Sequence, residues 1–352
     1  MKKLKSIKLK DMMMLFVLIG LLIAFQILCK YVTGRNFLSL ANVLNILGQN
    51  AYLLIIGVGI TFIMLGGGMD LSTGYLISTV GIVMALLNLN VFGTDTAMGF
   101  VLTMVCGVAL AVLLSAFNGA VYAWLKVFPF IITLAMQYIL NGATYLLSGG
   151  MTRTYQGLSN GFKILGGYNI TIGSGALKTG VIVAIVMVAL GAFILNKTRF
   201  GRNVYALGSN PDAVALSGVS VAKMRILVFA LAGLFFGVAQ VVNIGRINSV
   251  NNSMGVGTEF TVMAGCMLGG IKMGGGGGKM SNMVVGVLII GVLNSGMNFL
   301  NMNQYWQNVA LGIVLLAAIV LDTMQSVNAA KRAKLVMADQ LRSAGEHISE
   351  EV

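Results

Sequence analysis

The sequence predicts an all-α polytopic membrane protein with about ten transmembrane helices. Two features of composition indicate this class: 57% of the 352 residues are hydrophobic and only 9% are charged. The mean hydropathy of +0.90 agrees with them. Because soluble domains carry about 25% charged residues, this chain cannot cover a water-facing surface.

Apolar runs long enough to cross a bilayer recur along the whole chain. A transmembrane helix needs about 20 mainly apolar residues, because it rises about 1.5 Å per residue across a hydrocarbon core of about 30 Å. The runs that meet or approach this length are 12–29, 46–66, 71–89, 97–117, 128–148, 179–195, 225–244, 256–271, 282–300 and 306–322. Gln49 and Asn50 interrupt the run 46–66, and the run 256–271 is short and rich in glycine. A broken or re-entrant course therefore stays open for these two runs.

The transmembrane domain is predicted to cover residues 12–322, between a basic N-terminal segment, 1–11, and a polar tail, 323–352. The N-terminus resembles a signal peptide, but no small-residue cleavage site precedes Lys30, so we expect a retained first helix. Ten spans place both termini on one side. Of the Lys and Arg residues, 17 fall on that side and six on the other, which predicts that both termini are cytoplasmic. The longest segment on the other side, 149–178, is predicted to be an external loop.

The net charge of +13 does not indicate a nucleic-acid partner. The basic residues lie between apolar runs and form no stripe with interleaved aromatic residues. Cys29, Cys106 and Cys266 lie singly in or beside apolar runs, without the spacing of metal ligands, and are expected to be buried thiols. The sequence therefore predicts no metal site and no cofactor.

A polar segment, residues 196–222, interrupts the apolar runs and contains a compact helix signal. Asn210 is a suitable N-cap, and Pro211 fits the first helical position because its missing N–H costs nothing there. Asp212 places negative charge at the positive end of the helix dipole. Gly218 supplies a left-handed stop. These residues predict a helix of about two turns at the cytoplasmic surface.

The predicted helix, 211–217, is expected to expose Ala213, Val214 and Leu216 between cationic flanks. Such a short helix is marginal on its own. Two interpretations are open: an ordinary interhelical loop with one helical turn, or an element that docks into a partner protein.

Two glycine-rich segments lie between predicted spans. In the segment 65–72, Asp70 is either a functional acid at membrane depth or an N-cap for the third helix. The segment 274–278 resembles a phosphate-binding loop but fails its pattern. Met273 holds the first glycine position, and Met280 replaces the Ser or Thr that binds Mg²⁺. The sequence therefore predicts no nucleotide site, and the segment is expected to be a flexible cytoplasmic turn.

Polar side chains recur at helical spacing in three spans. The rows are Thr133, Gln137 and Asn141; Asn294, Asn298 and Asn301; and the shorter pair Gln240 and Asn243. Residues at these spacings share a helix face, which has to turn inward because lipid cannot satisfy an amide. Inward amides either hold helices together or line the path of a hydrogen-bonding solute.

Charged residues are nearly absent from these faces. An ion-coupled pump would need an intramembrane acid, base or His relay, and only Asp70 and an interfacial Glu259 are candidates. A neutral, hydroxyl-rich solute therefore fits the amide rows better than an ion does.

Together these motifs resemble those of the permease subunits of bacterial ABC importers for ribose, galactose, xylose and related monosaccharides. The resemblance covers about 36–322 in unbroken order. It rests on the Gly-Gly-Met-Asp-Leu-Ser turn at 67–72, Phe-Pro-Phe-Ile-Ile-Thr-Leu-Ala-Met at 128–136, Thr-Arg-Phe-Gly-Arg at 198–202, Ala-Leu-Gly-Ser-Asn-Pro-Asp-Ala at 206–213, Leu-Ser-Gly-Val at 216–219, Leu-Gly-Gly at 268–270, Leu-Asn-Ser-Gly at 293–296 and Asp322.

The resemblance implies two packed permease subunits of ten helices each, in the type II arrangement of vitamin B12 importers, with the solute path along their interface. The second subunit is another copy or a paralogue. The implied partners are two cytoplasmic ABC ATPase subunits and an extracytoplasmic solute-binding protein, and the implied location is the bacterial inner membrane. The chain would then be a transporter subunit and not an enzyme. The implied ATPase-coupling residues are Asn210, Pro211, Asp212, Ala213, Leu216 and Gly218, and the expected path residues are Asp70, Gln137, Asn141, Asn294 and Asn298.

Other solutes and another class of transporter stay open at this point. Within the importer class, the solute could be a nucleoside, autoinducer-2 or a polyol. An ion-coupled secondary transporter would instead need a membrane-embedded acid, for which Asp70 is the candidate.

Overall fold

The computed structural model describes residues 2–125, 127–320, 323–324 and 327, with side chains from residue 14 onward. Most of the predicted tail, 323–352, and Asp322 lie outside the described residues. The long helices are α1 (Lys2–Thr33), α2 (Leu40–Leu65), α3 (Thr73–Leu87), α4 (Ala97–Leu125), α5 (Pro129–Leu147), α7 (Thr179–Lys197), α10 (Val221–Ile247) and α12 (Met280–Phe299). The shorter helices are α6 (Asn160–Phe162), α8 (Arg199–Ser209), α9 (Pro211–Leu216), α11 (Thr258–Leu268), the π-helical turns Asn88–Phe92 and Lys163–Gly167, and a final helix, Gln304–Val320.

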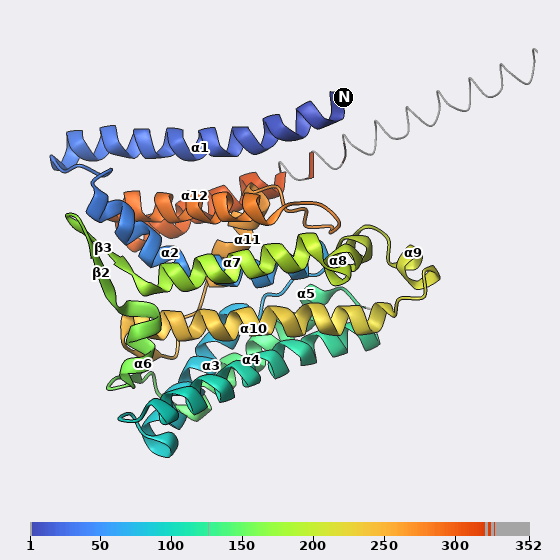
Figure 1. Cartoon of the computed structure of the whole chain (residues 1–352), viewed down its shortest axis with the longest axis horizontal. Coiled ribbons are helices and arrows are strands. Elements are labelled where there is room, and N and C mark those ends of the chain that lie inside the picture. Colours follow the sequence, from blue (N-terminus) through green and yellow to red (C-terminus); the bar gives the residue numbers. More distant parts are fainter. Residues whose placement is uncertain (1, 126, 321–322, 325–326, 328–352) are drawn as a thin grey trace, which may run out of the picture.

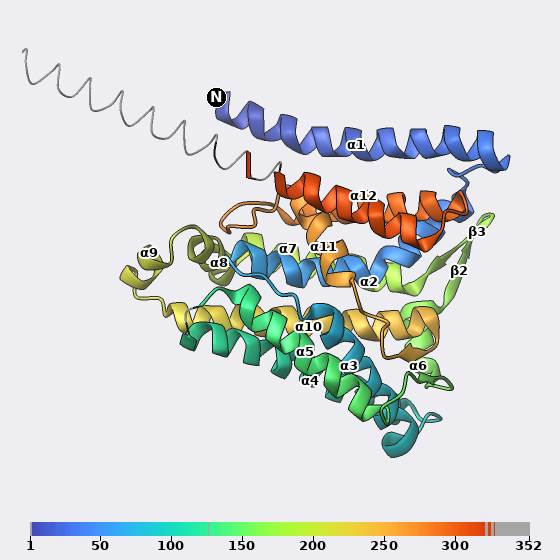
Figure 2. The same cartoon turned by 180° about the vertical axis from the view of Figure 1, so that it is seen from behind.

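The long helices run side by side along one axis of the molecule (Figure 1). At one end α8 and α9 project, and α1 begins at the same end, which we call the α9 end. At the opposite end lies a hairpin of β2 (Asn169–Ile172) and β3 (Gly175–Lys178), and we call this the hairpin end. The view from behind shows the same division (Figure 2). The polar segment 196–222 and the N-terminus therefore lie at the same end, as ten alternating spans require.

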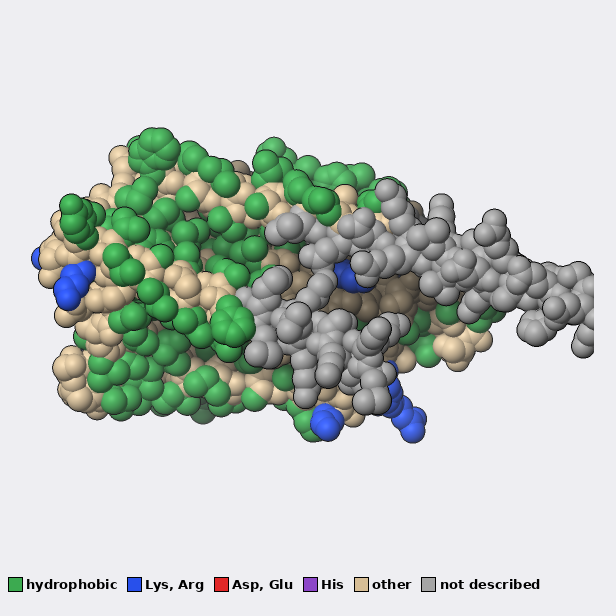
Figure 3. Space-filling model, turned by 90° about the horizontal axis from the view of Figure 1, so that it is seen from above, with side chains coloured by type: hydrophobic (Ala, Val, Ile, Leu, Met, Phe, Trp, Pro, Cys, Tyr) green, Lys and Arg blue, Asp and Glu red, His purple; other side chains and the backbone are tan. Residues whose placement is uncertain are grey.

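The surface has the character expected of a protein in lipid. In the face shown in Figure 3, hydrophobic side chains cover the middle of the molecule, and Lys and Arg side chains appear towards its two ends. In the most apolar stretch of α1, only 11% of the residues are buried inside the molecule, against 78% in α2 and 67% in α10. The helices α2 and α10 therefore form the centre of the bundle, and α1 lies at its edge.

Each predicted span forms a helix in the described part of the chain, and eight of these helices are long and apolar enough to cross a membrane. The second span is not broken, because α2 continues through Gln49 and Asn50. The eighth span is α11, whose 11 residues cover about 16 Å, roughly half of the hydrocarbon core. The eighth span is therefore a half-helix.

An irregular segment, 248–257, which consists of one short strand and a series of turns, leads from the hairpin end to the start of α11. At its beginning β4 (Val250–Asn251) pairs with β1 (Thr154–Tyr155). Further along, the Gly255 amide donates to Ser78 Oγ of α3 at 3.0 Å. Neighbouring helices thus satisfy this irregular backbone, as membrane depth requires. The eighth span is therefore a broken span, an irregular half followed by a half-helix, which is one of the two courses that the sequence left open.

The three cysteines differ in exposure. Cys29 and Cys266 are buried, as expected. Cys106 is exposed on α4, so the expectation of a buried thiol is wrong at that position. The face of α4 that packs against α3 and α10 is formed by other residues, among them the buried Thr103, Gly107 and Ala111. Cys106 lies on the outer face instead, where apolar character alone does not distinguish lipid contact from core contact.

Candidate functional site

The helix α9 forms as the sequence predicts. Asn210 Oδ1 accepts a hydrogen bond from the Ala213 amide at 3.0 Å, and Pro211 occupies the first turn together with Asp212. Gly218 takes a left-handed backbone with φ +81°. The helix ends at Leu216, one residue earlier than predicted.

The exposed face of α9 is smaller than expected. Leu216 is 91% exposed and Ala213 is also exposed, but Val214 is only 4% exposed. The expectation that Val214 faces outward is wrong, because α9 packs against α8 and α10 and turns this side chain inward. The docking role of α9 stays a prediction.

The polar segment joins the two glycine-rich segments at the α9 end. Gly208, at the end of α8, lies against Gly67 of the α2–α3 turn and against Gly275. The Leu65 carbonyl oxygen is also so near that a Cβ on Gly208 would collide with it. The Gly276 amide donates to that same carbonyl at 2.9 Å. The segment 274–278 therefore contacts α8 and the end of α2 through Gly275 and Gly276, and the predicted flexibility of this turn stays a prediction.

Asp70 organises the α2–α3 turn. It is 1% exposed, and its Oδ1 accepts from the Ser72 amide at 2.8 Å and from Ser72 Oγ at 2.6 Å. Ser72, and not Asp70, holds the N-cap position of α3, so the predicted capping role is wrong in detail. Asn118 of α4 donates to Ser72 Oγ at 2.9 Å, which ties the turn to a third helix. Burial raises the pKa of Asp70 to about 6, although the Ser72 hydrogen bonds oppose this shift.

Glu259 is also buried inside the bundle. It lies in the first turn of α11 with 1% exposure and touches Gly74 of α3. The sequence placed it at a membrane interface, and the half-helix course of α11 explains the difference.

The polar row on α5 separates into two parts. Thr133 Oγ1 accepts from the Leu71 amide at 3.1 Å, so it holds α5 against the α2–α3 turn. Gln137 and Asn141 each bury a side-chain oxygen that has no hydrogen-bond partner among the described residues. The structure does not pack α5 against α12, so these two amides are apart from Asn294 and Asn298.

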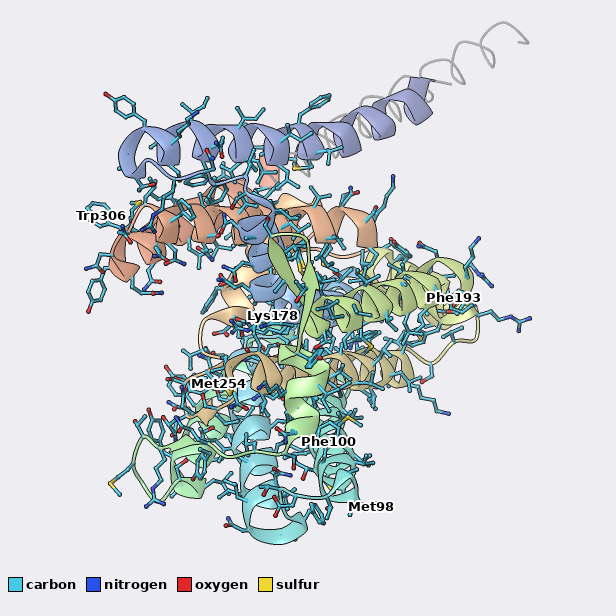
Figure 4. All side chains as sticks on the ribbon, turned by 60° about the vertical axis from the view of Figure 1, so that its left-hand side comes forward. Met98, Phe100, Lys178, Phe193, Met254 and Trp306 are labelled. Atoms are coloured by element: carbon cyan, nitrogen blue, oxygen red, sulfur yellow. The ribbon has the colours of Figure 1, made fainter. Side chains whose placement is uncertain are left out.

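Asn294 and Asn298 of α12 do line a cavity, of about 480 Å³, which we call the polar pocket. Its walls come from α2, the end of α10, the segment 254–261, α12 and the beginning of the final helix. Further hydroxyl and amide side chains of the wall are Thr258, Thr261, Gln304, Gln307 and Asn308. In Figure 4, Met254 and Trp306 mark the segments on either side of it. Sequence analysis therefore found two residues of this pocket from their helical spacing.

Arg246 is a pocket residue that sequence analysis missed. Its guanidinium lies over the ring of Tyr52 at 4.9 Å from the centroid, and its Nη2 donates to Asn243 Oδ1 at 2.9 Å. It continues the Gln240–Asn243 pair by three residues, and this spacing was the available signal. Arg246 was counted only as a charge that orients the chain.

A second cavity has a different character. It measures about 620 Å³ and lies between α2, α7 and α12, with walls of Leu, Val, Ile and Ala except near Asn196, Lys279 and Ser281. A wall of this composition offers few partners to a polar solute. The polar pocket is therefore the better candidate for a solute site.

A bundle of membrane-spanning helices around a half-helix and a polar pocket defines an integral membrane transport protein. The chain belongs to the family described as the permease component of branched-chain amino acid transport systems, whose profile matches residues 42–319. It is thus a multi-pass transporter subunit of the cell membrane and not an enzyme.

Curated relatives cover most of the chain. The galactose/methyl galactoside import permease protein MglC of Escherichia coli K12 is 33% identical over 297 residues, 82% of this chain and 88% of the relative. The fructose import permease protein FrcC of Rhizobium meliloti is 33% identical over 88% of this chain and 84% of its own length. The ribose import permease protein RbsC of Bacillus subtilis is 34% identical over 84% of this chain and 88% of its own length. No solved structure matches the chain significantly.

Proposed function

We propose that this chain is the membrane-spanning subunit of an ATP-driven ABC importer for a small neutral sugar. The observation that carries the proposal is that relatives named for galactose, fructose and ribose each match 82–88% of the chain. The shared feature of these solutes is a compact, uncharged body with many hydroxyl groups.

The polar pocket fits such a solute. Amides both donate and accept, so Asn294 and Asn298 can replace the water that a sugar hydroxyl leaves. Each hydroxyl left without a partner would cost about 1–3 kcal/mol. None of the described residues that line the pocket is acidic, which agrees with a solute that carries no positive charge. We assign these two amides to one part of the path, and Gln137 and Asn141 of α5 to another part that a second permease subunit completes.

The partners are assigned to the two ends of the molecule. The exposed Ala213 and Leu216 of α9, held by the caps at Asn210, Pro211 and Gly218, form the proposed contact with an ATPase subunit. Asp212 supports the same helix through its dipole. An extracytoplasmic solute-binding protein would meet the hairpin end.

The test is uptake of labelled galactose, fructose and ribose by cells that produce this chain with candidate ATPase and solute-binding subunits from the same organism. We expect uptake of at least one sugar, and its loss when the ATPase is inactivated. Uptake of a nucleoside, autoinducer-2 or a polyol, without any of the three sugars, would contradict the sugar assignment. Uptake that continues without the ATPase and follows the proton gradient would favour an ion-coupled transporter.

A further inference from the structure

Three buried polar atoms on one face of α10 have no hydrogen-bond partner among the described residues. They are Gln240 Oε1, Asn243 Nδ2 and Arg246 Nε. The three residues are spaced i, i+3 and i+6, so they form one row on the helix. Buried polar atoms without partners are rare in native proteins, and three in one row require an explanation.

The row lies directly behind the polar pocket. Arg246 is part of the pocket wall and is bonded to Asn243. Gln240 Nε2 donates to Met254 Sδ at 3.0 Å, and Met254 is also part of the wall. Thioether sulfur is a weak acceptor, so this contact satisfies the Gln240 amide poorly. The unpaired polar atoms of α10 are thus connected to the cavity through Arg246 and Met254, which both line it.

Arg246 is held in a fixed position at this wall. The face of Tyr52 supports one side of its guanidinium, and Asn243 fixes one of its amino groups. Among the described residues, no carboxylate lines the pocket to neutralise the charge. A guanidinium carries five N–H donors in a rigid plane, and two of them can bond to a pair of adjacent oxygens.

We propose that the polar pocket, backed by Gln240, Asn243 and Arg246, is a station that binds one monosaccharide during transport. In this station Arg246 donates to a pair of neighbouring hydroxyls and determines specificity, and the amides of Asn294 and Asn298 bind others. The volume of about 480 Å³ lies in the range of about 300–1,000 Å³ that small-molecule pockets occupy. The inference rests on the proposed sugar import, which it deepens by naming a site.

The charge of Arg246 also sets what the station rejects. A cationic solute would meet an unneutralised guanidinium in a partly buried site, where like charges repel more strongly than in water. Amino sugars should therefore compete poorly with their neutral counterparts at the station.

The first experiment measures occupation of the station directly. Asn308 is exposed and lines the pocket, so an Asn308→Cys variant, with Cys29, Cys106 and Cys266 replaced by serine, is labelled in membranes with a water-soluble thiol reagent. We expect millimolar concentrations of the transported sugar to slow labelling, and an amino sugar to have little effect. Equal labelling rates with and without the sugar would overturn the station.

The second experiment isolates the role of Arg246. Arg246→Gln should raise the KM for sugar uptake about tenfold with little change in the maximal rate. The KM of Arg246→Lys should lie between that of the parent and that of Arg246→Gln. The matched control is Arg225→Gln, because Arg225 lies on the same helix and stacks on Tyr122 at 4.1 Å, but at the α9 end. Arg225→Gln should leave sugar protection of Asn308→Cys unchanged, whereas Arg246→Gln should abolish it.

The outcomes separate this inference from the proposed function. If the importer takes up sugar but Arg246→Gln keeps both the parent KM and the protection, the station is wrong and the import function stands. If none of the three sugars is taken up, the import function fails and the sugar station fails with it. Sugar protection of Asn308→Cys is measured first with Arg246 intact. The test therefore still decides whether the pocket binds sugar if an Arg246 variant does not fold.

Discussion

At the scale of single residues, Asp70 shows how one buried carboxylate can hold a turn. Both hydrogen bonds to Ser72 end on Oδ1, and Oδ2 has no partner among the described residues. An asparagine can keep the oxygen that accepts these bonds, whereas an alanine would leave the buried Ser72 amide unsatisfied, at a cost of about 1–3 kcal/mol.

We therefore predict that Asp70→Asn reduces sugar uptake only modestly and that Asp70→Ala is clearly destabilised. The pH dependence gives a second readout. Because burial raises the pKa of Asp70 to about 6, the parent is most stable with Asp70 protonated and loses stability as the pH rises through about 6. The Asn variant lacks this loss, so thermal unfolding in detergent should show its melting temperature gaining on the parent as the pH rises towards about 6, with no further gain above that pH. Complete loss of uptake in Asp70→Asn at normal membrane levels, with proton-dependent uptake in the parent, would instead assign Asp70 to ion coupling.

Residues whose role depends on near neighbours in sequence were predictable, and those whose role depends on distant partners were not. The cap at Asn210 involves an amide three residues away, so the sequence contains all of it. Arg246 depends on Tyr52 of another helix and on the irregular segment beside Met254. No pattern within α10 could indicate those contacts.

At the scale of elements, α9 is the proposed contact with the ATPase. We predict that Leu216→Glu lowers both uptake and sugar-stimulated ATP hydrolysis by about tenfold or more, because a charge would have to be desolvated at the contact. Leu216→Met should keep most of both activities, since it preserves the apolar side chain. Membrane levels of the two variants serve as the control for insertion. Normal ATP hydrolysis in Leu216→Glu would exclude α9 from the contact.

The glycine junction between α8, the α2–α3 turn and the segment 274–278 is a second element that can be tested. Gly208→Ala would force its Cβ against the Leu65 carbonyl and the Gly276 amide, and we expect it to cost about 1–3 kcal/mol and to impair coupling. Gly274→Ala is the matched control, because a Cβ there meets nothing within 4 Å. The comparison uses thermal stability in detergent together with sugar-stimulated ATP hydrolysis. Equal behaviour of the two variants would show that close packing at Gly208 does not matter.

Hydropathy predicted the long helices well because each has to cross the same apolar layer. It could not give the length of α11, since the glycines of 255–270 carry no periodic signal that separates a half-helix from a full span. It also missed α8, a polar helix whose buried side is Gly201, Val204 and Leu207. A helix at the membrane surface needs only such a narrow apolar stripe, which a search for long apolar runs overlooks.

At the scale of the whole molecule, the order of spans determines which segments share an end. Each crossing reverses the chain, so the α2–α3 turn, 196–222 and 274–278 lie together at the α9 end, as predicted and as Figures 1 and 2 show. The absolute orientation is a separate matter. It rests on the excess of Lys and Arg, several of which lie in the basic N-terminus and the tail, outside the side chains that the structure describes.

The last prediction concerns this orientation. With the native cysteines replaced by serine, Ser174→Cys in the β2–β3 turn and Ser217→Cys after α9 place one exposed thiol at each end of the molecule. The positive-inside rule predicts that a membrane-impermeant thiol reagent labels Ser174→Cys in intact cells and Ser217→Cys only after the membrane is opened. Cys106 has to be removed first, because its exposure on α4 would add a background signal. The reverse labelling pattern would show the opposite orientation in the membrane, in which α9 faces away from any cytoplasmic ATPase.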